Sequence, residues 1–436
     1  MRPRILRLIL LVAMVARLAV LAFAWKAPHR LETPDSAGYI NLSASLIEDG
    51  RFESDGQAEI NRTPGYPFFL AFSSALGNHA HHAAALVQVL LDVTLVYLTF
   101  LLGWMLGGDQ RTGWIAAAFQ AVSPLAVTGS VRILSDSLFA FLLILSLLLI
   151  VFHIRLGRRW ALVAAAVTMG AACYVRPAGM AFGVICVLVL LSRRWFARAG
   201  LFAVILAACL SPWVVRNAIV AEYTGFSSFA GDSLYFFAVA DLIAADEGID
   251  PDDARSQLKR IDLRENIDRA PGPAANFRLK LALQAIGQRP WLYAKTHLKG
   301  CVGFFLPGST DVLEVCGVTT GNRGTLDVLH KDGPLAAWRH YFGDNIPAMV
   351  FVAATGVLLL GQYLGVILCA VRRFGRSMPA EAWLLAVVVI VAAILPGPYG
   401  LPRYRIPVEP VLAVSAALGF TRSRRGHSPA KPAPST

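Results

Sequence analysis

About ten apolar segments constrain the fold of this chain more than any other feature of its sequence. A helix needs ~20 mostly apolar residues to cross the hydrocarbon layer of a membrane. Most of the segments approach that length, and three are shorter. The sequence therefore predicts an all-α polytopic membrane protein with about ten transmembrane helices, over residues 5–24, 83–107, 112–130, 137–154, 160–175, 178–192, 200–214, 346–371, 380–397 and 403–420.

The composition of the chain supports this class. Hydrophobic residues make up 56% of the 436 residues and charged residues only 16%, whereas soluble domains carry roughly 25% charged residues. The high apolar content, with only six cysteines, also excludes disordered, collagen-like and disulfide-scaffold proteins. A polytopic membrane protein is the class that remains.

The basic residues predict the orientation of the chain. If the spans alternate from a cytoplasmic N-terminus, every strongly basic cluster lies on the cytoplasmic side, as the positive-inside rule requires. We therefore expect both termini in the cytoplasm. The net charge of +12 follows from topology, and no nucleic-acid partner is predicted. The clusters comprise Arg2, Arg4, Arg111, Arg155, Arg158, Arg159, Arg193, Arg194, Arg198, Arg372, Arg373, Arg376, Arg422, Arg424, Arg425 and Lys431.

Two long loops then lie on the outer side, and they define the expected organisation. A membrane domain over residues 1–214 carries the first outer loop, at 25–82. The second outer loop covers 215–345, C-terminal membrane helices follow at 346–421, and a disordered cytoplasmic tail covers 422–436. Within the second loop, residues 241–271 are rich in charge, which is typical of a solvated helix. Residues 274–305 include Trp291 and Tyr293 and favour a helix at the membrane interface.

Several common chemical motifs are absent from the sequence. It contains no GxxxxGK(S/T) phosphate loop and no GxGxxG fingerprint, so no nucleotide cofactor is predicted. No CxxC or HExxH spacing occurs, and a polar loop is a better interpretation of His79, His81 and His82 than a zinc site. We predict no metal. Cys301 and Cys316 both fall in the second outer loop, where the sequence leaves open whether they form a disulfide.

Arginines and aspartates gather at the outer ends of the predicted spans. The positive-inside rule does not explain these arginines, although each one alone suits an ordinary helix end. Together they indicate a polar site at the outer membrane surface. The segments are Thr33-Pro34-Asp35-Ser36-Ala37-Gly38-Tyr39, Asn61-Arg62-Thr63-Pro64-Gly65-Tyr66-Pro67, Arg132 with Asp136, Arg176-Pro177, Arg216-Asn217 and Arg403-Tyr404-Arg405-Ile406-Pro407.

These residue types suit one kind of ligand. A guanidinium group binds phosphate through paired hydrogen bonds, and the position at the membrane surface suits a phosphate carried on a lipid. An aspartate there can serve as a base, or as an acceptor that orients a hydroxyl nucleophile. How far apart the two aspartates lie is not readable from the sequence.

In this combination, the motifs resemble the polyprenyl-phosphate-sugar-dependent glycosyltransferases of the GT-C fold. The nearest resemblance is to the protein mannosyltransferase and aminoarabinose-transferase group. It extends from the first outer loop through the last span, and the combination carries it because each motif is short. It implies a GT-C-like fold with interfacial helices on two outer loops. It also implies a hexosyl or pentosyl transferase that uses a polyprenyl-phosphate sugar donor and a lipid, glycan or protein acceptor at the extracytoplasmic face of the cell membrane.

Carried over residue by residue, the resemblance makes Asp35 the catalytic base. Asp136, the second acidic position, is implied to be the second catalytic carboxylate and to bind acceptor or sugar. Contact with the donor phosphate is implied for Arg62, and less directly for Arg176, Arg216, Arg403 and Arg405. Substrate binding is implied for Tyr39, Tyr66 and Tyr404. Ser36 stands where some relatives carry a second acidic residue, which departs from the metal-dependent pattern.

Two other functions compete with a transferase. A lipid or glycolipid flippase would have its charged groups near the bilayer midplane, and the one conspicuous midspan acid here is Asp92. A carboxylate at that depth costs ~2.5–3.5 kcal/mol, so we expect a partner for Asp92 or a water-filled setting. A non-catalytic assembly partner in envelope biosynthesis would keep the fold while tolerating the loss of Asp35.

Overall fold

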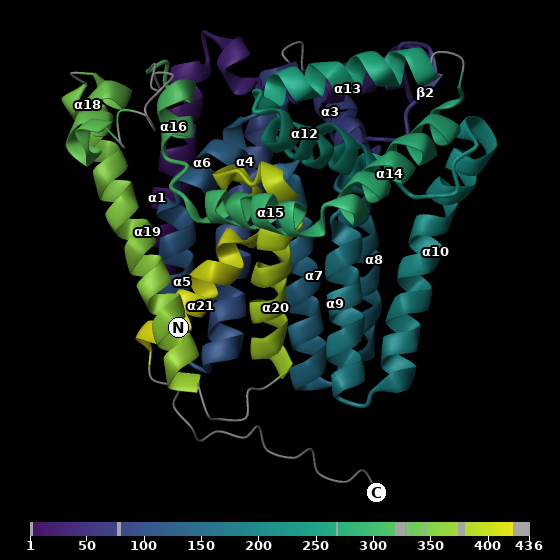
Figure 1. Ribbon diagram of the computed structural model, residues 1–436. Helices are drawn as coiled ribbons and strands as arrows, with labels where there is room; N and C mark the ends of the chain where they lie inside the picture. Colours follow the sequence, from purple (N-terminus) through teal and green to yellow (C-terminus); the bar gives the residue numbers. More distant parts are fainter. Residues whose placement is uncertain are drawn as a thin grey trace, which may run out of the picture.

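A bundle of long helices stands beneath a layer of shorter helices and loops (Figure 1). The computed structural model describes residues 3–75, 80–266, 269–318, 328, 331–343, 345–373 and 380–421. Within these ranges the only strands are β1 (Glu53–Ser54) and β2 (Gln57–Ala58), which pair antiparallel. The predicted all-α class is therefore confirmed. The tail expected over 422–436 lies outside the described residues.

Five helices are long and apolar enough to cross a membrane. They are α1 (Pro3–Ala24), α4 (Ala80–Gly107), α7 (Asp136–Leu156), α10 (Phe196–Ala221) and α19 (Ile346–Arg373). Three shorter apolar helices accompany them: α8 (Arg159–Val175), α9 (Gly179–Ser192) and α20 (Ala380–Ile394). All eight coincide with predicted spans, and they make the chain a multi-pass membrane protein.

Two predicted spans are not single straight helices. The span expected at 112–130 is α5 (Gln110–Val122) followed by α6 (Pro124–Val131), with a bend of 58° between them. Pro124 cannot continue α5, and the Ser123 hydroxyl caps α6 by accepting from the Ala126 N–H. The span expected at 403–420 is a 3₁₀ segment, η4 (Pro402–Val408), followed by α21 (Glu409–Phe420).

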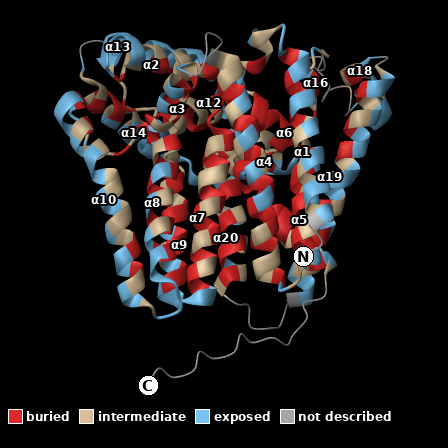
Figure 2. Ribbon diagram, turned by 180° about the vertical axis from the view of Figure 1, so that it is seen from behind, coloured by how far each residue is buried: buried red, intermediate tan, exposed pale blue. Residues whose placement is uncertain are grey.

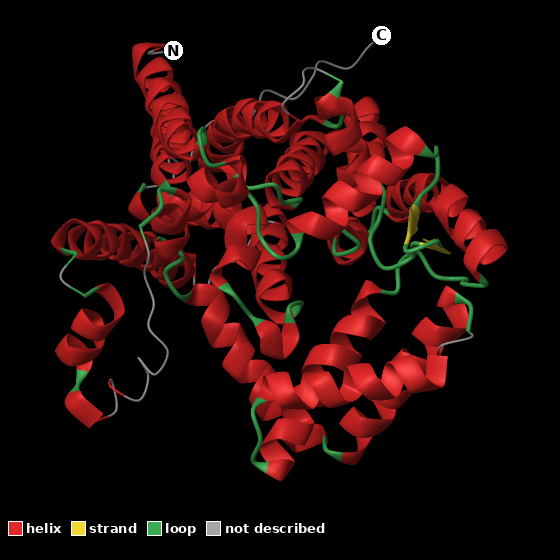
Figure 3. Cartoon of the chain, turned by 90° about the horizontal axis from the view of Figure 1, so that it is seen from above, coloured by secondary structure: helices red, strands yellow, loops and turns green. Residues whose placement is uncertain are grey.

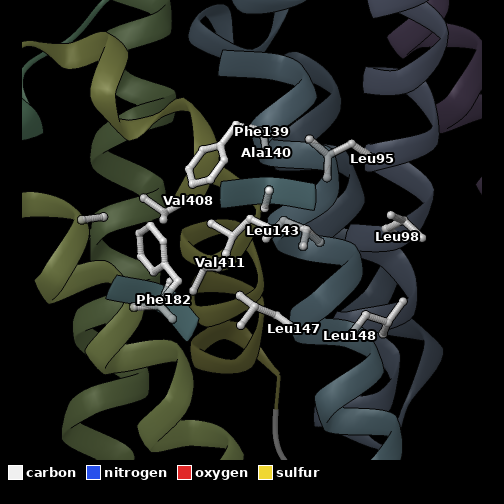
Figure 4. Packing of buried hydrophobic residues seen from close by; sticks show 14 of the residues in the cluster. Leu95, Leu98, Phe139, Ala140, Leu143, Leu147, Leu148, Phe182, Val408 and Val411 are labelled. Atoms are coloured by element: carbon white, nitrogen blue, oxygen red, sulfur yellow. The ribbon is translucent and has the colours of Figure 1, made fainter. Parts of the chain in front are cut away.

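The apolar core lies between α4, α7, α9, η4 and α21. Leu143 and Leu147 of α7 are completely buried there and pack with Phe182, Val408 and Val411 (Figure 4). By contrast, α1, α10 and α19 lie at the periphery and expose wide apolar faces (Figure 2). Such faces suit contact with lipid, because lipid tails impose no cost on exposed apolar side chains.

Residues 28–74, within the segment predicted to be the first outer loop, fold into short elements above the bundle. They are η1 (Pro28–Leu31), α2 (Ser36–Glu48), the β1–β2 hairpin and α3 (Gly65–Ser74). In the view from above, bundle helices appear end-on, whereas helices of the outer loops lie across the view (Figure 3).

The second outer loop is also helical. Its charged part and its apolar part each form two helices, and the helix expected over 274–305 breaks where Pro290 begins a new one. In order, the elements are α11 (Phe229–Ser233), η2 (Leu234–Val239), α12 (Ala240–Glu247), α13 (Pro251–Asn266), α14 (Pro271–Gln288), α15 (Pro290–Phe305), α16 (Thr310–Val315) and α18 (Pro334–Phe342). Trp291, at the start of α15, is 87% exposed, as suits an interfacial helix.

Asp92 has the partner that its depth requires. Its carboxylate accepts a hydrogen bond of 2.5 Å from Nε of Arg17, and both side chains are buried. Arg17 also donates to the carbonyls of Ala13 and Ala121. The pair ties α1 to α4 in the bundle interior, so of the two expected settings the structure shows a partner for Asp92.

The described residues include Cys301 and Cys316, whose pairing the sequence left open, and two of the three clustered histidines. Cys301 and Cys316 are free thiols, not a disulfide. His81 pairs with Glu32 at 3.4 Å, and Nε2 of His82 lies 2.9 Å from the Trp25 carbonyl. His79 lies outside the described residues.

Candidate active site

The first turn of α2 is attached to the turn between α6 and α7. The Ser36 hydroxyl donates to the Ile133 carbonyl at 2.8 Å, and the Ile133 N–H donates to the Leu31 carbonyl at 2.8 Å. One turn further along α2, the Tyr39 hydroxyl lies 3.2 Å from the Ser135 hydroxyl. Because Asp35 precedes Ser36 and Asp136 follows Ser135, these contacts bring both predicted aspartates to one junction.

Asp136 is the buried member of this junction. It begins α7 and is completely inaccessible. Both of its oxygens face the Arg176 guanidinium, at 2.7 Å and 3.0 Å, and Nε of Arg176 donates to Ser135 at 2.8 Å. Oδ2 accepts a charge-assisted hydrogen bond from Arg176, whereas Oδ1 is buried without a hydrogen-bond partner among the described residues and contributes only the ion-pair contact. Asp136 is thus an internal partner of Arg176, and its predicted contact with acceptor or sugar stays a prediction.

Asp35 is the accessible member. Its side chain is 45% exposed and forms an ion pair with Arg403 of η4. The Arg403 guanidinium also lies over the Tyr404 ring, 5.2 Å from its centroid. The predicted base and one predicted phosphate ligand are therefore neighbours, although 368 positions separate them in the chain.

Arg62 lies beside α2. Its guanidinium carbon is 5.1 Å from the centroid of the Tyr39 ring. It packs so closely against Gly38 that a Cβ on that glycine would come within 2.4 Å of Nη1. Within the described ranges, no carboxylate oxygen lies within 4.0 Å of the Arg62 guanidinium. Arg62 is consequently a cation without a counter-charge at this junction, and it is only half-buried.

Two acidic residues of α16, Asp311 and Glu314, lie close to arginines of the site. Arg132, at the end of α6, donates to Glu314 of α16 at 2.7 Å. Burial raises the pKa of the nearby Asp311, and the positive charges of Arg132 and Arg403 act in the opposite direction. Sequence reasoning found Arg132 but missed Glu314 and Asp311, because 182 residues separate Glu314 from its partner and no local pattern marks α16.

Three predicted site residues have other partners. Arg216 uses Nη1 and Nη2 to donate to the carbonyls of Glu59 and Phe52, each at 2.7 Å. Arg405 is 2% exposed and pairs with Glu409 at 2.5 Å. Tyr66 is completely buried, and its hydroxyl donates to Gln88 at 2.7 Å. These internal contacts use some of the polar groups of the three residues, and the expectation that they contact phosphate or substrate stays a prediction.

The remaining predicted residues stay together. Tyr39 and Tyr404 are partly buried beside the Arg62 and Arg403 guanidinium groups. Around α2, the junction thus has the accessible carboxylate of Asp35, the cation Arg403 paired with it, and the cation Arg62 without a carboxylate partner among the described residues. This fold and site define a polytopic helical membrane protein whose arginine-rich site, at one end of the bundle, suits an anionic headgroup.

The sequence of the central part matches one protein family. Residues 61–215 match the family model described as dolichyl-phosphate-mannose-protein mannosyltransferase. This segment begins just before Arg62 and includes Asp136 and Arg176. It is about a third of the chain, and it confirms the expected resemblance there. No curated protein shows significant sequence similarity to the chain.

A solved glycosyltransferase structure shares the fold. The apo oligosaccharyltransferase of Archaeoglobus fulgidus superposes with a TM-score of 0.50 at 17% identity, over 95% of this chain and 50% of that one. ArnT of Cupriavidus metallidurans, solved with undecaprenyl phosphate, gives a TM-score of 0.40 at 15% identity, over 92% of this chain and 77% of that one. The chain spans about half the length of the archaeal enzyme. The expected GT-C-like fold is confirmed.

Proposed function

We propose that this chain is an integral-membrane glycosyltransferase that moves a sugar from a polyprenyl-phosphate carrier to an acceptor on the extracytoplasmic side. The observation that carries the proposal is the junction of α2 and α7, where an exposed Asp35 lies beside Arg403 and an unpaired Arg62 projects nearby. A flippase has no need of an accessible carboxylate at the membrane surface. The family match over residues 61–215 supports a transferase as well.

The proposed donor is a lipid because of where the site lies. Sugar nucleotides are confined to the cytoplasm, so an outward-facing transferase needs a sugar delivered on a membrane carrier. The orientation rests on the positive-inside rule, which places both termini in the cytoplasm. Membrane lipids surround the bundle, and the acceptor is a lipid, a glycan or a protein.

In the proposed reaction, Asp35 takes the proton from an acceptor hydroxyl or amine. The acceptor atom forms a bond to the anomeric carbon of the sugar, and the bond from that carbon to the phosphate oxygen breaks. The lipid phosphate leaves with the electron pair. Arg62 and Arg403 are the cations placed to stabilise its developing charge.

The ion pair between Asp35 and Arg403 suggests the order of the steps in the proposed reaction. While Arg403 donates to Asp35, it occupies an oxygen of the carboxylate that would otherwise be free to accept the proton of the acceptor. A donor phosphate offers Arg403 a second anion and so draws it away from the carboxylate. We therefore expect the donor to bind before Asp35 acts as a base.

Replacement of Asp35 tests the proposed reaction. Membranes that lack the native protein would receive either wild type or Asp35→Asn at matched expression, with labelled polyprenyl-phosphate sugars supplied. Loss of a positioned base typically costs ~10²–10⁴-fold in rate, so we expect Asp35→Asn to transfer almost no label. The label would be counted in lipid, glycan and protein fractions, which identifies the acceptor class.

Asp49→Asn is the matched control, because Asp49 caps the other end of α2 and is exposed. It should transfer label like wild type. Equal transfer by wild type and Asp35→Asn would remove Asp35 as the base. Lipid translocation without transfer from any donor would support the flippase instead.

A further inference from the structure

Three consecutive carbonyl groups just before Arg62 are held from outside their own loop. Each accepts a hydrogen bond from a different residue of α10 or of the segment that follows it. We call these contacts the 59–61 clamp. They run from Arg216 Nη1 to Glu59 at 2.7 Å, from the Ser228 N–H to Ile60 at 2.9 Å, and from the Ser227 hydroxyl to Asn61 at 2.6 Å.

Asp232 of α11 connects the clamp to the rest of the second outer loop. Its Oδ2 accepts from the Asn61 side chain at 2.6 Å and from the Ser228 hydroxyl at 2.7 Å. Its Oδ1 accepts from Arg278 of α14 at 3.0 Å. Asp232 is only 8% exposed, so each of these bonds is largely shielded from water and stronger for it.

Arg278 extends the network to α13. It forms two hydrogen bonds to the Asp262 carboxylate, at 2.7 Å and 3.0 Å, and Asn266 donates to the same carboxylate at 2.7 Å. Bidentate geometry within a network distinguishes these ion pairs from exposed surface pairs, which contribute little. The network therefore gives the clamp a rigid support.

The clamp lies directly before Arg62, the proposed ligand of the donor phosphate. The Arg62 N–H is bound by the Glu59 carboxylate at 2.9 Å, and Pro64 restricts the backbone two residues later. On the other side, Gly38 and Tyr39 pack against the guanidinium. The Arg62 backbone is held by Glu59, and its guanidinium packs against Gly38 and Tyr39 of α2. Together these contacts restrict the orientation of the Arg62 side chain.

We propose that Asp232 is a positioning residue for the donor phosphate, acting through the 59–61 clamp to hold the Arg62 guanidinium in place. This inference rests on the proposed function, in which Arg62 binds that phosphate. It assigns the second outer loop a part in donor binding. It also gives Arg216 a role, because Arg216 supplies one contact of the clamp.

A purely structural Asp232 would affect stability without acting through Arg62, and a double-mutant cycle separates the two cases. The probe is undecaprenyl phosphate, titrated into the full-length protein in detergent micelles. The cycle compares wild type, Arg62→Gln, Asp232→Asn and the double variant. Small misplacement of a binding group costs up to ~10²-fold, so we expect Asp232→Asn to raise the Kd about tenfold.

In the Arg62→Gln background, Asp232→Asn should leave the Kd unchanged, because the group that it positions is already gone. Arg289→Gln is the matched control. It breaks an ion pair with Asp246 in the same loop, and it should bind the probe like wild type. Thermal unfolding of each variant identifies any that fail to fold, in which case Ser227→Ala, which removes one clamp contact, replaces Asp232→Asn in the cycle.

The outcomes separate this inference from the proposed function. Independent effects of Asp232→Asn and Arg62→Gln would overturn it, as would an unchanged Kd in Asp232→Asn. If Arg62→Gln binds the probe like wild type, the role of Arg62 fails and the inference fails with it. A wild-type protein that binds no undecaprenyl phosphate would contradict the proposed function itself.

Discussion

Individual arginines of this chain have very different surroundings, although the sequence marks them alike. Arg17 and Arg405 are buried, and each has a carboxylate partner. Arg216 has no carboxylate partner and donates to backbone carbonyls instead. Among the described residues, Arg62 has neither a carboxylate within 4.0 Å of its guanidinium nor backbone carbonyls bound to it as Arg216 has, and this makes it a candidate phosphate ligand. A guanidinium has five donors, so a ligand role requires that some of them remain unused.

The buried pair of Arg17 and Asp92 carries a prediction about stability. Asp92→Asn leaves a guanidinium in the bundle interior without its counter-charge, and breaking a buried pair in this way costs about 3–5 kcal/mol. We expect a loss of that size in the free energy of unfolding, measured by SDS titration in mixed micelles. Asp49→Asn, at an exposed position, should stay within ~0.5 kcal/mol of wild type.

The double variant Arg17→Met/Asp92→Leu tests whether the uncompensated charge of Arg17 causes the loss of stability. It removes both charges and fills the space with apolar side chains, so it should be more stable than Asp92→Asn alone. If it proves less stable than the single variant, the cost does not come from the uncompensated charge.

Among the elements, α15 is coupled to the site through close backbone packing. Its Gly300 and Gly303 lie against the segment that includes η3 (Gly397–Tyr399), and a Cβ on either glycine would come within 2.1 Å of a carbonyl oxygen there. That segment leads directly into Arg403. The position of α15 therefore affects the partner of Asp35 through a few residues of rigid backbone.

Gly303→Ala should disturb this contact. The added methyl group meets the Gly400 carbonyl, and overpacking of this kind costs about 1–3 kcal/mol. We expect a lower thermal unfolding temperature and slower sugar transfer. Gly287→Ala in α14 is the control, since a Cβ there has no atom within 4 Å. It should be as stable as wild type or slightly more stable, because alanine favours a helix. Equal behaviour of the two variants would contradict the packing argument.

In the whole molecule, the polar site and the outer loops share one end of the bundle (Figure 1). The turn between α9 and α10, which includes Arg194, lies at the other end. The proposed function requires the polar end to face away from the cytoplasm. Sugar nucleotides are absent on that side, so a sugar carried on a lipid is the donor available there. The orientation is therefore a property that an experiment on the intact membrane decides.

Labelling with a membrane-impermeant maleimide checks the orientation. In a variant without native cysteines, Asp49→Cys should react in intact cells, since residue 49 is exposed in the outer layer. Arg194→Cys should react only after the cells are permeabilised. The reverse pattern would place the site in the cytoplasm and remove the main reason for a lipid-linked donor.

Local sequence patterns predicted much of the fold. Five long apolar helices follow from hydrophobic length, because a membrane span requires it, and three shorter apolar helices follow from the same apolar runs. Pro124 is a local indication of the bend after Ser123, since proline cannot continue a helix. The prediction of one span over 112–130 missed it, because the run is apolar throughout. The 3₁₀ segment before α21 was concealed in the same way, although Pro402, Pro407 and Pro410 all lie near it.

The sequence by itself determined that this chain is a helical membrane protein with arginines and aspartates at one set of helix ends. Composition, span length and charge bias are sums over many residues, and they survive errors at any one of them. Only the tertiary structure decided that Asp35 is accessible and paired with Arg403, that Asp136 is buried against Arg176, and that Arg62 has no ion-pair partner among the described residues. Whether a charged side chain binds a ligand depends on which of its hydrogen bonds are already made, and those partners come from distant parts of the chain.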